Sequence, residues 1–311
     1  MARSLPMWQP VGLTLLLLGL FPWLNPPVYY ISLLFTVFMY VTLATSWNLI
    51  GGYTGYLSFG HVAFFGLGAY TTAFLFNLLH LSPLLTILSS IPAGGAAALV
   101  AIIIGVPCLR LRGPYFAVIT LCFAFVVELA VKNLSILGGA DGLWLKSMDL
   151  PIEIARSILF EVMMVLMLIV VAASFLVGRS RFGAGLRAIK EDEEVAQTMA
   201  IDSARLKIGA FVLSALFTGA AGGIYAYYLA YIHPDIVFDI NISILVVLMA
   251  LFGGGGSWLG PVIGAVLLTL INEGLSTFVR AELARIIYGS LFIIVTIYMP
   301  NGIIDFFRKR R

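Results

Sequence analysis

The sequence predicts an all-α, polytopic membrane protein with about ten transmembrane helices. Hydrophobic residues make up 61% of the 311 residues, and charged residues only 11%. A soluble domain carries about 25% charged residues, so this much apolar surface needs lipid around it. The apolar stretches run continuously over helical lengths, whereas the strands of a membrane barrel alternate apolar and polar residues. Helices are therefore the expected spanning elements.

Ten apolar runs come close to the length of about 20 residues that a spanning helix needs. They are residues 10–22, 28–50, 57–79, 84–107, 114–131, 157–178, 208–231, 241–253, 260–279 and 285–300. The first, eighth and last runs are short, so about eight to ten spans are expected. Pro22-Trp23 follows the first run in place of a small-residue cleavage site, which favours an uncleaved first helix. We treat residues 1–311 as one transmembrane domain.

The Lys and Arg residues predict the orientation of the chain. If the N-terminus is inside and ten spans alternate, 13 of the 18 basic residues lie inside. The inside set is Arg3, Arg110, Arg112, Arg179, Arg181, Arg187, Lys190, Arg205, Lys207 and Arg308–Arg311, and the outside set is Lys132, Lys146, Arg156, Arg280 and Arg285. The positive-inside rule then places both termini in the cytoplasm. Arg308–Arg311 is interpreted as a membrane anchor, and no nucleic-acid partner is expected.

A first glycine-rich stretch lies between two apolar runs, from Ser46 to His61. Glycine destabilises a helix by about 1 kcal/mol relative to alanine, so the helix is expected to end or to pack very closely here. One interpretation is a tight hairpin with a Gly51-x-x-x-Gly55 packing face. The other is a broken helix whose free backbone groups line a transport path. The candidate path residues in this stretch are Gly51, Gly52, Gly55, Tyr56, Ser58 and His61.

A second glycine-rich stretch, residues 253–261, also separates two apolar runs. Glycine-interrupted segments in corresponding halves of a transporter indicate a site between two structural repeats. One such segment lies in each half of this chain, although residue identity shows no repeat. The candidate path residues here are Gly253, Gly254, Gly255, Gly256 and Ser257. Gly219–Gly223 predicts close packing within the seventh helix.

The long charged segment between spans is residues 179–207, on the predicted inside. Residues 185–201 have the periodicity of a single amphipathic helix. A helix that lies on lipid would be markedly basic, whereas the charges here are nearly balanced. This balance favours a helix that docks in a groove of a partner protein, and a solvated linker helix is the alternative.

Motifs of catalysis are missing from the sequence. It has no phosphate-binding loop, nucleophile elbow, zinc signature or dinucleotide fingerprint. We therefore expect a transport subunit that is not an enzyme and has no cofactor or metal, with energy from a gradient or from another polypeptide. The ionisable residues in or near spans are His61, Glu128, Glu161 and Glu273, mostly expected near span ends. They form no relay, which argues against a proton-coupled secondary transporter.

Four separated segments carry a family resemblance. They are residues 47–70, the Leu109–Ala117 stretch Leu-Arg-Leu-Arg-Gly-Pro-Tyr-Phe-Ala, the Leu-Gly-Gly-Ala-Asp-Gly stretch of residues 137–142, and residues 179–223, which are followed by the loop at 253–261. Together they cover most of the chain in order. The chain resembles the LivM-like permease subunits of the branched-chain amino-acid ABC importers. It departs from that family at Ala200, where glycine is frequent, and at Leu137 and Ala140, where Thr and Ser are common.

The resemblance implies a bacterial inner-membrane importer for branched-chain or similar small amino acids. It implies a second, related permease subunit, two cytoplasmic ATPase subunits and a periplasmic or lipid-anchored binding protein. Residues 179–207 resemble the loop that docks on the ATPase. The coupling residues carried over are Gly185, Arg187, Ala188, Glu191, Asp192, Glu194 and Met199. The alternatives are a permease for urea or short amides, and a stand-alone secondary transporter or channel.

Overall fold

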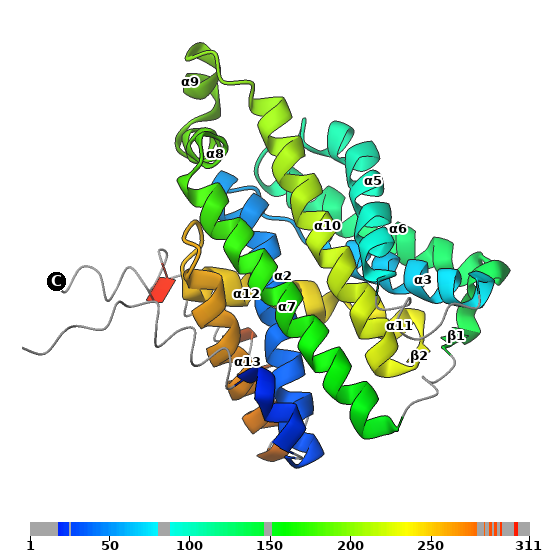
Figure 1. Cartoon of the computed structure of the whole chain (residues 1–311). Coiled ribbons are helices and arrows are strands. Elements are labelled where there is room, and N and C mark those ends of the chain that lie inside the picture. The colour runs from blue at the N-terminus through cyan, green and yellow to red at the C-terminus, as the bar shows by residue number, and fades with distance from the viewer. Residues whose placement is uncertain are drawn as a thin grey trace, which may run out of the picture.

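The computed structural model describes residues 18–24, 26–79, 88–145 and 151–278, with scattered residues between 283 and 303. In chain order its elements are η1 (Phe21–Leu24), α2 (Val28–Thr54), α3 (His61–Leu79), α5 (Ser90–Cys108), α6 (Pro114–Asn133), η2 (Ser135–Leu137), η3 (Gly139–Asp141), β1 (Leu143–Trp144), α7 (Ile152–Arg179), α8 (Arg181–Glu191), α9 (Glu193–Thr198), α10 (Ser203–Leu229), β2 (Tyr231–Ile232), α11 (Pro234–Val237), α12 (Ile240–Gly253) and α13 (Gly260–Phe278). The long helices form a bundle with α8 and α9 at one end (Figure 1). The two short strands pair antiparallel beyond the other end of α10.

Six helices in the described part of the chain are long and apolar enough to span a membrane. They are Val28–Thr54, Ser90–Cys108, Pro114–Asn133, Ile152–Arg179, Ser203–Leu229 and Pro234–Gly253. His61–Phe76 and Gly260–Gly274 are shorter apolar helices. The all-α, multi-pass class is thus confirmed, and eight of the predicted runs correspond to apolar helices. The first and last runs, 10–22 and 285–300, lie largely outside the described residues.

Helix α10 runs through the centre of the bundle and packs closely on α3 and α5. A Cβ added at Gly219 would lie 2.5 Å from the Ala97 Cβ of α5, and one at Gly222 would lie 2.0 Å from the Phe65 carbonyl oxygen of α3. Lipid supplies no hydrophobic drive between helices, so small residues that admit close backbone contact stabilise such interfaces. The predicted close packing around Gly219–Gly223 is confirmed.

Helices α5, α6 and α7 carry large apolar side chains on their outer faces. Ile103 of α5 is 73% exposed, and Val126 of α6 and Leu176 of α7 are similarly open. An apolar surface of this extent is costly in water and favourable in lipid. These faces are therefore the lipid-facing perimeter of the bundle.

The described basic residues gather at one end of the bundle. The end with α8 and α9 holds Arg110, Arg112, Arg179, Arg181, Arg187, Lys190, Arg205 and Lys207, whereas the opposite ends of α6 and α7 hold Lys132 and Arg156. Arg112 precedes α6 in the sequence and lies at the α8–α9 end of the bundle, where its guanidinium is 2.9 Å from the carboxylate of Glu194. The two ends of the bundle thus differ strongly in positive charge.

Candidate functional site

The first glycine-rich stretch interrupts the bundle between α2 and α3. Helix α2 continues through Gly51 and Gly52 and ends at Gly55, whose φ of +77° lies in the left-handed region. The N–H of Gly55 donates to the Gly51 carbonyl and closes the last turn. Residues 55–60 then connect to α3, which begins at His61. We call residues 55–60 the first break.

The first break leads back into the interior of the bundle. His61 Nε2 lies 2.6 Å from Ser214 Oγ, and the N–H of Val62 donates to Ser243 Oγ at 3.0 Å. Ser214 lies 11 residues beyond Ser203, the first residue of α10. At 1.5 Å per residue this places the start of α3 roughly 17 Å along α10. The backbone between α2 and α3 is therefore an irregular segment and not a tight hairpin, and a transport path along it stays a prediction.

Side chains satisfy the backbone of the first break inside the bundle. The Trp47 indole N–H donates to the Ser58 carbonyl at 2.8 Å, and the N–H of Phe59 donates to Thr120 Oγ1 at 3.2 Å. Irregular backbone at membrane depth persists only where protein or water supplies such partners. His61 is the first residue of α3 and is only 2% exposed, so it lies at a helix end that is buried inside the bundle.

The second glycine-rich stretch forms a tight hairpin. Helix α12 ends at Gly253, and α13 begins at Gly260. Ser257 Oγ donates to the Gly254 carbonyl at 3.0 Å and accepts from the N–H of Gly260 at 2.9 Å. We call residues 254–259 the second break.

Asn48 joins α2 to the second break. Its amide nitrogen donates to the Ser257 carbonyl at 2.9 Å, and its amide oxygen accepts from the N–H of Gly256 at 2.8 Å. A Cβ added at Gly256 would lie 3.0 Å from the Gly52 carbonyl oxygen, so the two backbones nearly touch. The structure thus brings Gly52 together with the second-break candidates, while Ser58 and His61 lie deeper in the bundle.

The charged segment 179–207 contains two helices, which corrects the prediction of one amphipathic helix over residues 185–201. Asp192 separates α8 from α9 with an extended backbone at φ −158°. Its carboxylate accepts from the N–H groups of Glu194 and Val195 and caps α9. A capped start satisfies N–H groups that a helix terminus leaves free, so capping overrides the periodicity here. We call α8 and α9 together the coupling unit.

The coupling unit buries only part of its predicted apolar face. Leu186, Ile189 and Ala196 are buried against the bundle, whereas Met199 is 72% exposed and Val195 is also open. The apolar residues of α9 therefore leave a surface that the described part of the chain does not cover.

Some of the predicted coupling residues bond to the rest of the chain, and others are exposed. Arg187 donates to the Gly178 carbonyl at 2.9 Å, and Glu194 accepts from Arg112. Glu191 is exposed and Ala188 is half-buried. Asp192 acts as the cap between the two helices.

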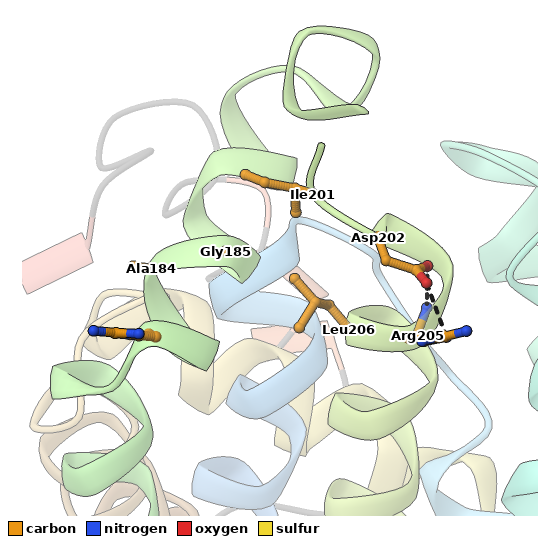
Figure 2. Close-up of a pocket in the computed structure, with 7 residues that line it drawn as sticks. Ala184, Gly185, Ile201, Asp202, Arg205 and Leu206 are labelled. Atoms are coloured by element: carbon orange, nitrogen blue, oxygen red, sulfur yellow. Dashed lines mark hydrogen bonds and ion pairs between the residues drawn. The ribbon is translucent and has the colours of Figure 1, made fainter. Parts of the chain in front are cut away.

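A groove of about 510 Å³ runs between α8 and the start of α10. Its lining residues are Arg181, Ala184, Gly185, Ile201, Asp202, Arg205 and Leu206. Figure 2 shows Leu206 beside the α8 backbone at Gly185, with the Asp202–Arg205 ion pair on the α10 side. A Cβ added at Gly185 would lie 2.6 Å from Leu206 Cδ1, so the small residue lets α8 cross α10 closely.

Two side chains that were not among the predicted site residues connect the coupling unit to the end of α2 and to the first break. Lys190 Nζ of α8 donates to the Gly52 carbonyl at 3.0 Å. Glu193 of α9 accepts from the Tyr56 hydroxyl and from Lys207 Nζ, both at 2.6 Å. A lysine four residues inside an apolar helix is the sequence signal that could have indicated a buried ion pair at Lys207.

Glu193 is ionised in this cluster. Burial alone would raise the pKa of its carboxyl, but the Lys207 ammonium and the Tyr56 hydroxyl that donate to it outweigh burial, with help from Arg112. The pKa of Glu193 is therefore lower than its ordinary value. The described residues contain no group of three or more His, Cys, Asp or Glu side chains that could hold a metal ion.

Comparisons with known proteins find one family of membrane permeases that matches most of the chain. The family described as "Branched-chain amino acid transport system / permease component" matches residues 29–296. The chain is 29% identical to the high-affinity branched-chain amino acid transport system permease protein LivM of Salmonella typhimurium over 301 residues, which cover 88% of this chain and 69% of that protein. It is 22% identical to a probable branched-chain amino acid transport permease protein LivM of Methanocaldococcus jannaschii, over 86% of this chain and 90% of the relative.

A second type of permease is similar over a shorter stretch. The chain is 28% identical to the permease protein LivH of Escherichia coli over 137 residues, or 44% of each protein. No solved structure matches the chain. The match to residues 29–296, on a bundle of apolar helices with a charged unit at one end, shows that the chain belongs to the branched-chain amino acid transport permease family.

Proposed function

We propose that this chain is one permease subunit of an ABC importer that carries branched-chain amino acids across the bacterial inner membrane. The family match over residues 29–296 is the observation that carries the proposal. The working complex contains a second, related permease subunit, two ATPase subunits and a substrate-binding protein. Similarity to both LivM and LivH proteins supports a pair of different permeases.

The orientation follows from the charge of the two bundle ends. The end with the coupling unit carries most of the described basic residues, and Lys and Arg concentrate on the cytoplasmic side of membrane proteins. We place this end, residues 179–207 and both termini in the cytoplasm.

The exposed surface of the coupling unit is the proposed contact with an ATPase subunit. Met199 and Val195 supply exposed apolar area, Glu191 adds an open charge, and the groove beside Gly185 adds a concave surface. An apolar centre with a charged rim is the composition of a protein–protein interface.

The two breaks are the proposed moving parts of the transport path. Closure of the ATPases on ATP moves the coupling unit, and the permease pair shifts between inward- and outward-facing populations. Irregular backbone next to buried polar side chains can change its hydrogen bonds without the cost of unwinding a helix. The path candidates remain Gly51, Gly52, Gly55, Tyr56, Ser58, His61 and Gly253–Ser257.

Reconstitution tests the proposal. The chain is purified with its permease partner, ATPases and binding protein, and labelled leucine uptake into proteoliposomes is measured with and without ATP. We expect uptake only with ATP and the binding protein. Leucine flux through the chain alone, without ATP, would identify a channel or secondary transporter, and ATP-driven uptake of urea but not leucine would identify an amide permease.

The docking surface is tested by charge reversal. Glu191→Lys changes an open charge and should reduce ATP hydrolysis by the assembled complex. Glu194→Lys also breaks the ion pair with Arg112, so Arg112→Met is its matched control. Unchanged ATP hydrolysis and uptake in Glu191→Lys would place the docking surface elsewhere.

A further inference from the structure

The coupling unit contacts the chain on both sides of Gly55, once from each of its helices. On the α2 side, Lys190 Nζ of α8 donates to the Gly52 carbonyl. On the other side, the Tyr56 hydroxyl donates to Glu193 of α9. Gly55 between them has the left-handed backbone at which α2 ends. The two contacts therefore bracket the single residue at which the helix breaks.

The Lys190 contact satisfies a backbone group that the helix leaves free. Gly52 is among the last four residues of α2, whose carbonyls have no regular partner within the helix. The carbonyl end of a helix also carries partial negative charge, which favours a cation. A Cβ added at Gly256 would lie 3.4 Å from the same Lys190 Nζ, so the ammonium group lies between the end of α2 and the second break.

The Glu193 contact is part of a buried charge cluster. The Lys207 side chain is 4% exposed and its Nζ also donates to the Leu109 carbonyl at 3.1 Å and to the Tyr56 hydroxyl at 2.9 Å. Removing either charge of a buried pair leaves the other unpaired at a cost of several kcal/mol. This cost holds α9 in one position relative to α10 and to Tyr56.

The first break extends this connection into the bundle. From Tyr56 only a few residues of irregular backbone lead to His61, where α3 begins beside the middle of α10. The Ser58 carbonyl accepts from the Trp47 indole of α2, and the N–H of Phe59 donates to the Thr120 hydroxyl of α6. The only covalent route from Tyr56 to the buried start of α3 is this anchored backbone.

We infer that Lys190 and Glu193 are positioning residues that link movement of the coupling unit to movement of the first break. The inference rests on the proposed function, because the work would come from an attached ATPase. A purely structural role for the two contacts would lower the amount of folded complex. It would not change how much substrate is carried per ATP hydrolysed.

The test measures that ratio in the assembled complex. Leucine uptake and ATP hydrolysis are recorded in proteoliposomes for the wild-type complex and for Lys190→Met, Lys190→Arg and Tyr56→Phe. We expect Lys190→Met and Tyr56→Phe to lower leucine carried per ATP by at least about fivefold, the lower end of coupling factors between protein sites. Lys190→Arg should keep the wild-type ratio, because a guanidinium can still donate to the Gly52 carbonyl. Arg110→Met is the matched control, since Arg110 is an exposed cation at the same end, outside both contacts.

Two results would overturn the inference. One is a wild-type ratio in both Lys190→Met and Tyr56→Phe while the wild-type complex couples ATP to uptake. The other is an equal loss in Arg110→Met, which would make the effect one of general charge. Tyr56→Phe keeps the ring and the Lys207–Glu193 pair, so it stays informative if Lys190→Met does not assemble. A wild-type complex without ATP-dependent uptake would instead refute the proposed function.

Discussion

The two breaks have similar glycine-rich sequences but opposite geometry. The first break runs back into the bundle, where side chains of α2 and α6 satisfy its backbone. Side chains of α10 and α12 bond to the first two residues of α3. The second break turns tightly between α12 and α13, whose backbones touch. Glycine serves conformation in both breaks, because Gly55, Gly254 and Gly256 all have positive φ. Close backbone approach is an added use at Gly253 and Gly260, on either side of the second break. A run of glycines alone does not distinguish these two uses, because the neighbouring side chains determine the outcome.

The largest effect is expected where glycine serves close approach. A Cβ at Gly264 of α13 would lie 1.9 Å from the Met249 carbonyl oxygen and 2.8 Å from the Gly253 nitrogen, both of them backbone atoms. Because these backbone atoms cannot move aside, the added methyl group overpacks the helix contact, and we expect Gly264→Ala to lower the free energy of unfolding by about 3 kcal/mol. Thermal unfolding of the purified protein in detergent measures it.

Gly274→Ala in the same helix is the matched control. A Cβ there meets no described atom within 4 Å, so the helix should gain up to about 1 kcal/mol. Equal melting temperatures for the two variants would show that α12 and α13 do not touch in this way.

The next effect concerns the link that Asn48 makes between α2 and the second break. Asn48→Leu leaves the Gly256 N–H and the Ser257 carbonyl without their side-chain partner. Because buried polar groups without partners are costly, we expect Asn48→Leu to lower the free energy of unfolding by about 2 kcal/mol and to reduce uptake. Ser46→Ala is the control, because the Ser46 hydroxyl bonds only to Thr42 within α2 and should contribute less than about 1 kcal/mol. A melting temperature of Asn48→Leu no lower than that of Ser46→Ala would contradict the link.

A smaller effect is expected where glycine serves conformation. A Cβ at Gly55 would meet only Lys190 Cγ, at an ordinary 3.5 Å, so space is not limiting. Because of the left-handed backbone alone, we expect Gly55→Ala to lower the free energy of unfolding by about 1–2 kcal/mol. Gly55→Asn should lose less, because asparagine tolerates this conformation. If Ala and Asn cost the same at this position, crowding and not backbone conformation is the reason for glycine.

The sequence predicts the fold class well and the breaks in part. Continuous apolar runs predict spanning helices because lipid admits few other structures. The glycine stretches predict that chain regularity ends near residues 51–60 and 253–261. The direction of the first break depends on Thr120, Ser214 and Ser243, which lie on helices far along the chain and carry no local signal.

The coupling unit shows why the remaining detail was not predictable. Helical periodicity over residues 185–201 is real, but the carboxylate of Asp192 offers the backbone a cap that periodicity does not reveal. Asn48 reaches Gly256 and Ser257 across most of the sequence. Lys207 and Glu193 pair only because α9 folds back on α10. Contacts of this kind depend on the tertiary packing and not on sequence spacing.

The smallest expected effect, of opposite sign, lies just after the C-terminal end of α9. Ala200 has φ +60°, the left-handed region that Gly55 occupies in the first break. The N–H of Ala200 donates to the Gln197 carbonyl and that of Ile201 to the Ala196 carbonyl, the pair of bonds that ends a helix at a left-handed residue. Glycine is the usual residue at this position of a helix end.

Ala200→Gly should therefore stabilise the protein by about 0.5–1 kcal/mol, because relief of the left-handed strain exceeds the greater chain entropy of glycine in the unfolded state. Ala184→Gly is the matched control, because Ala184 is exposed within α8 and should lose about 1 kcal/mol of helix propensity. Thermal unfolding in detergent should raise the melting temperature of the first variant and lower that of the second. Destabilisation by Ala200→Gly would mean that the end of α9 does not adopt this left-handed turn. The left-handed backbone would then be needed at Gly55 but not at residue 200.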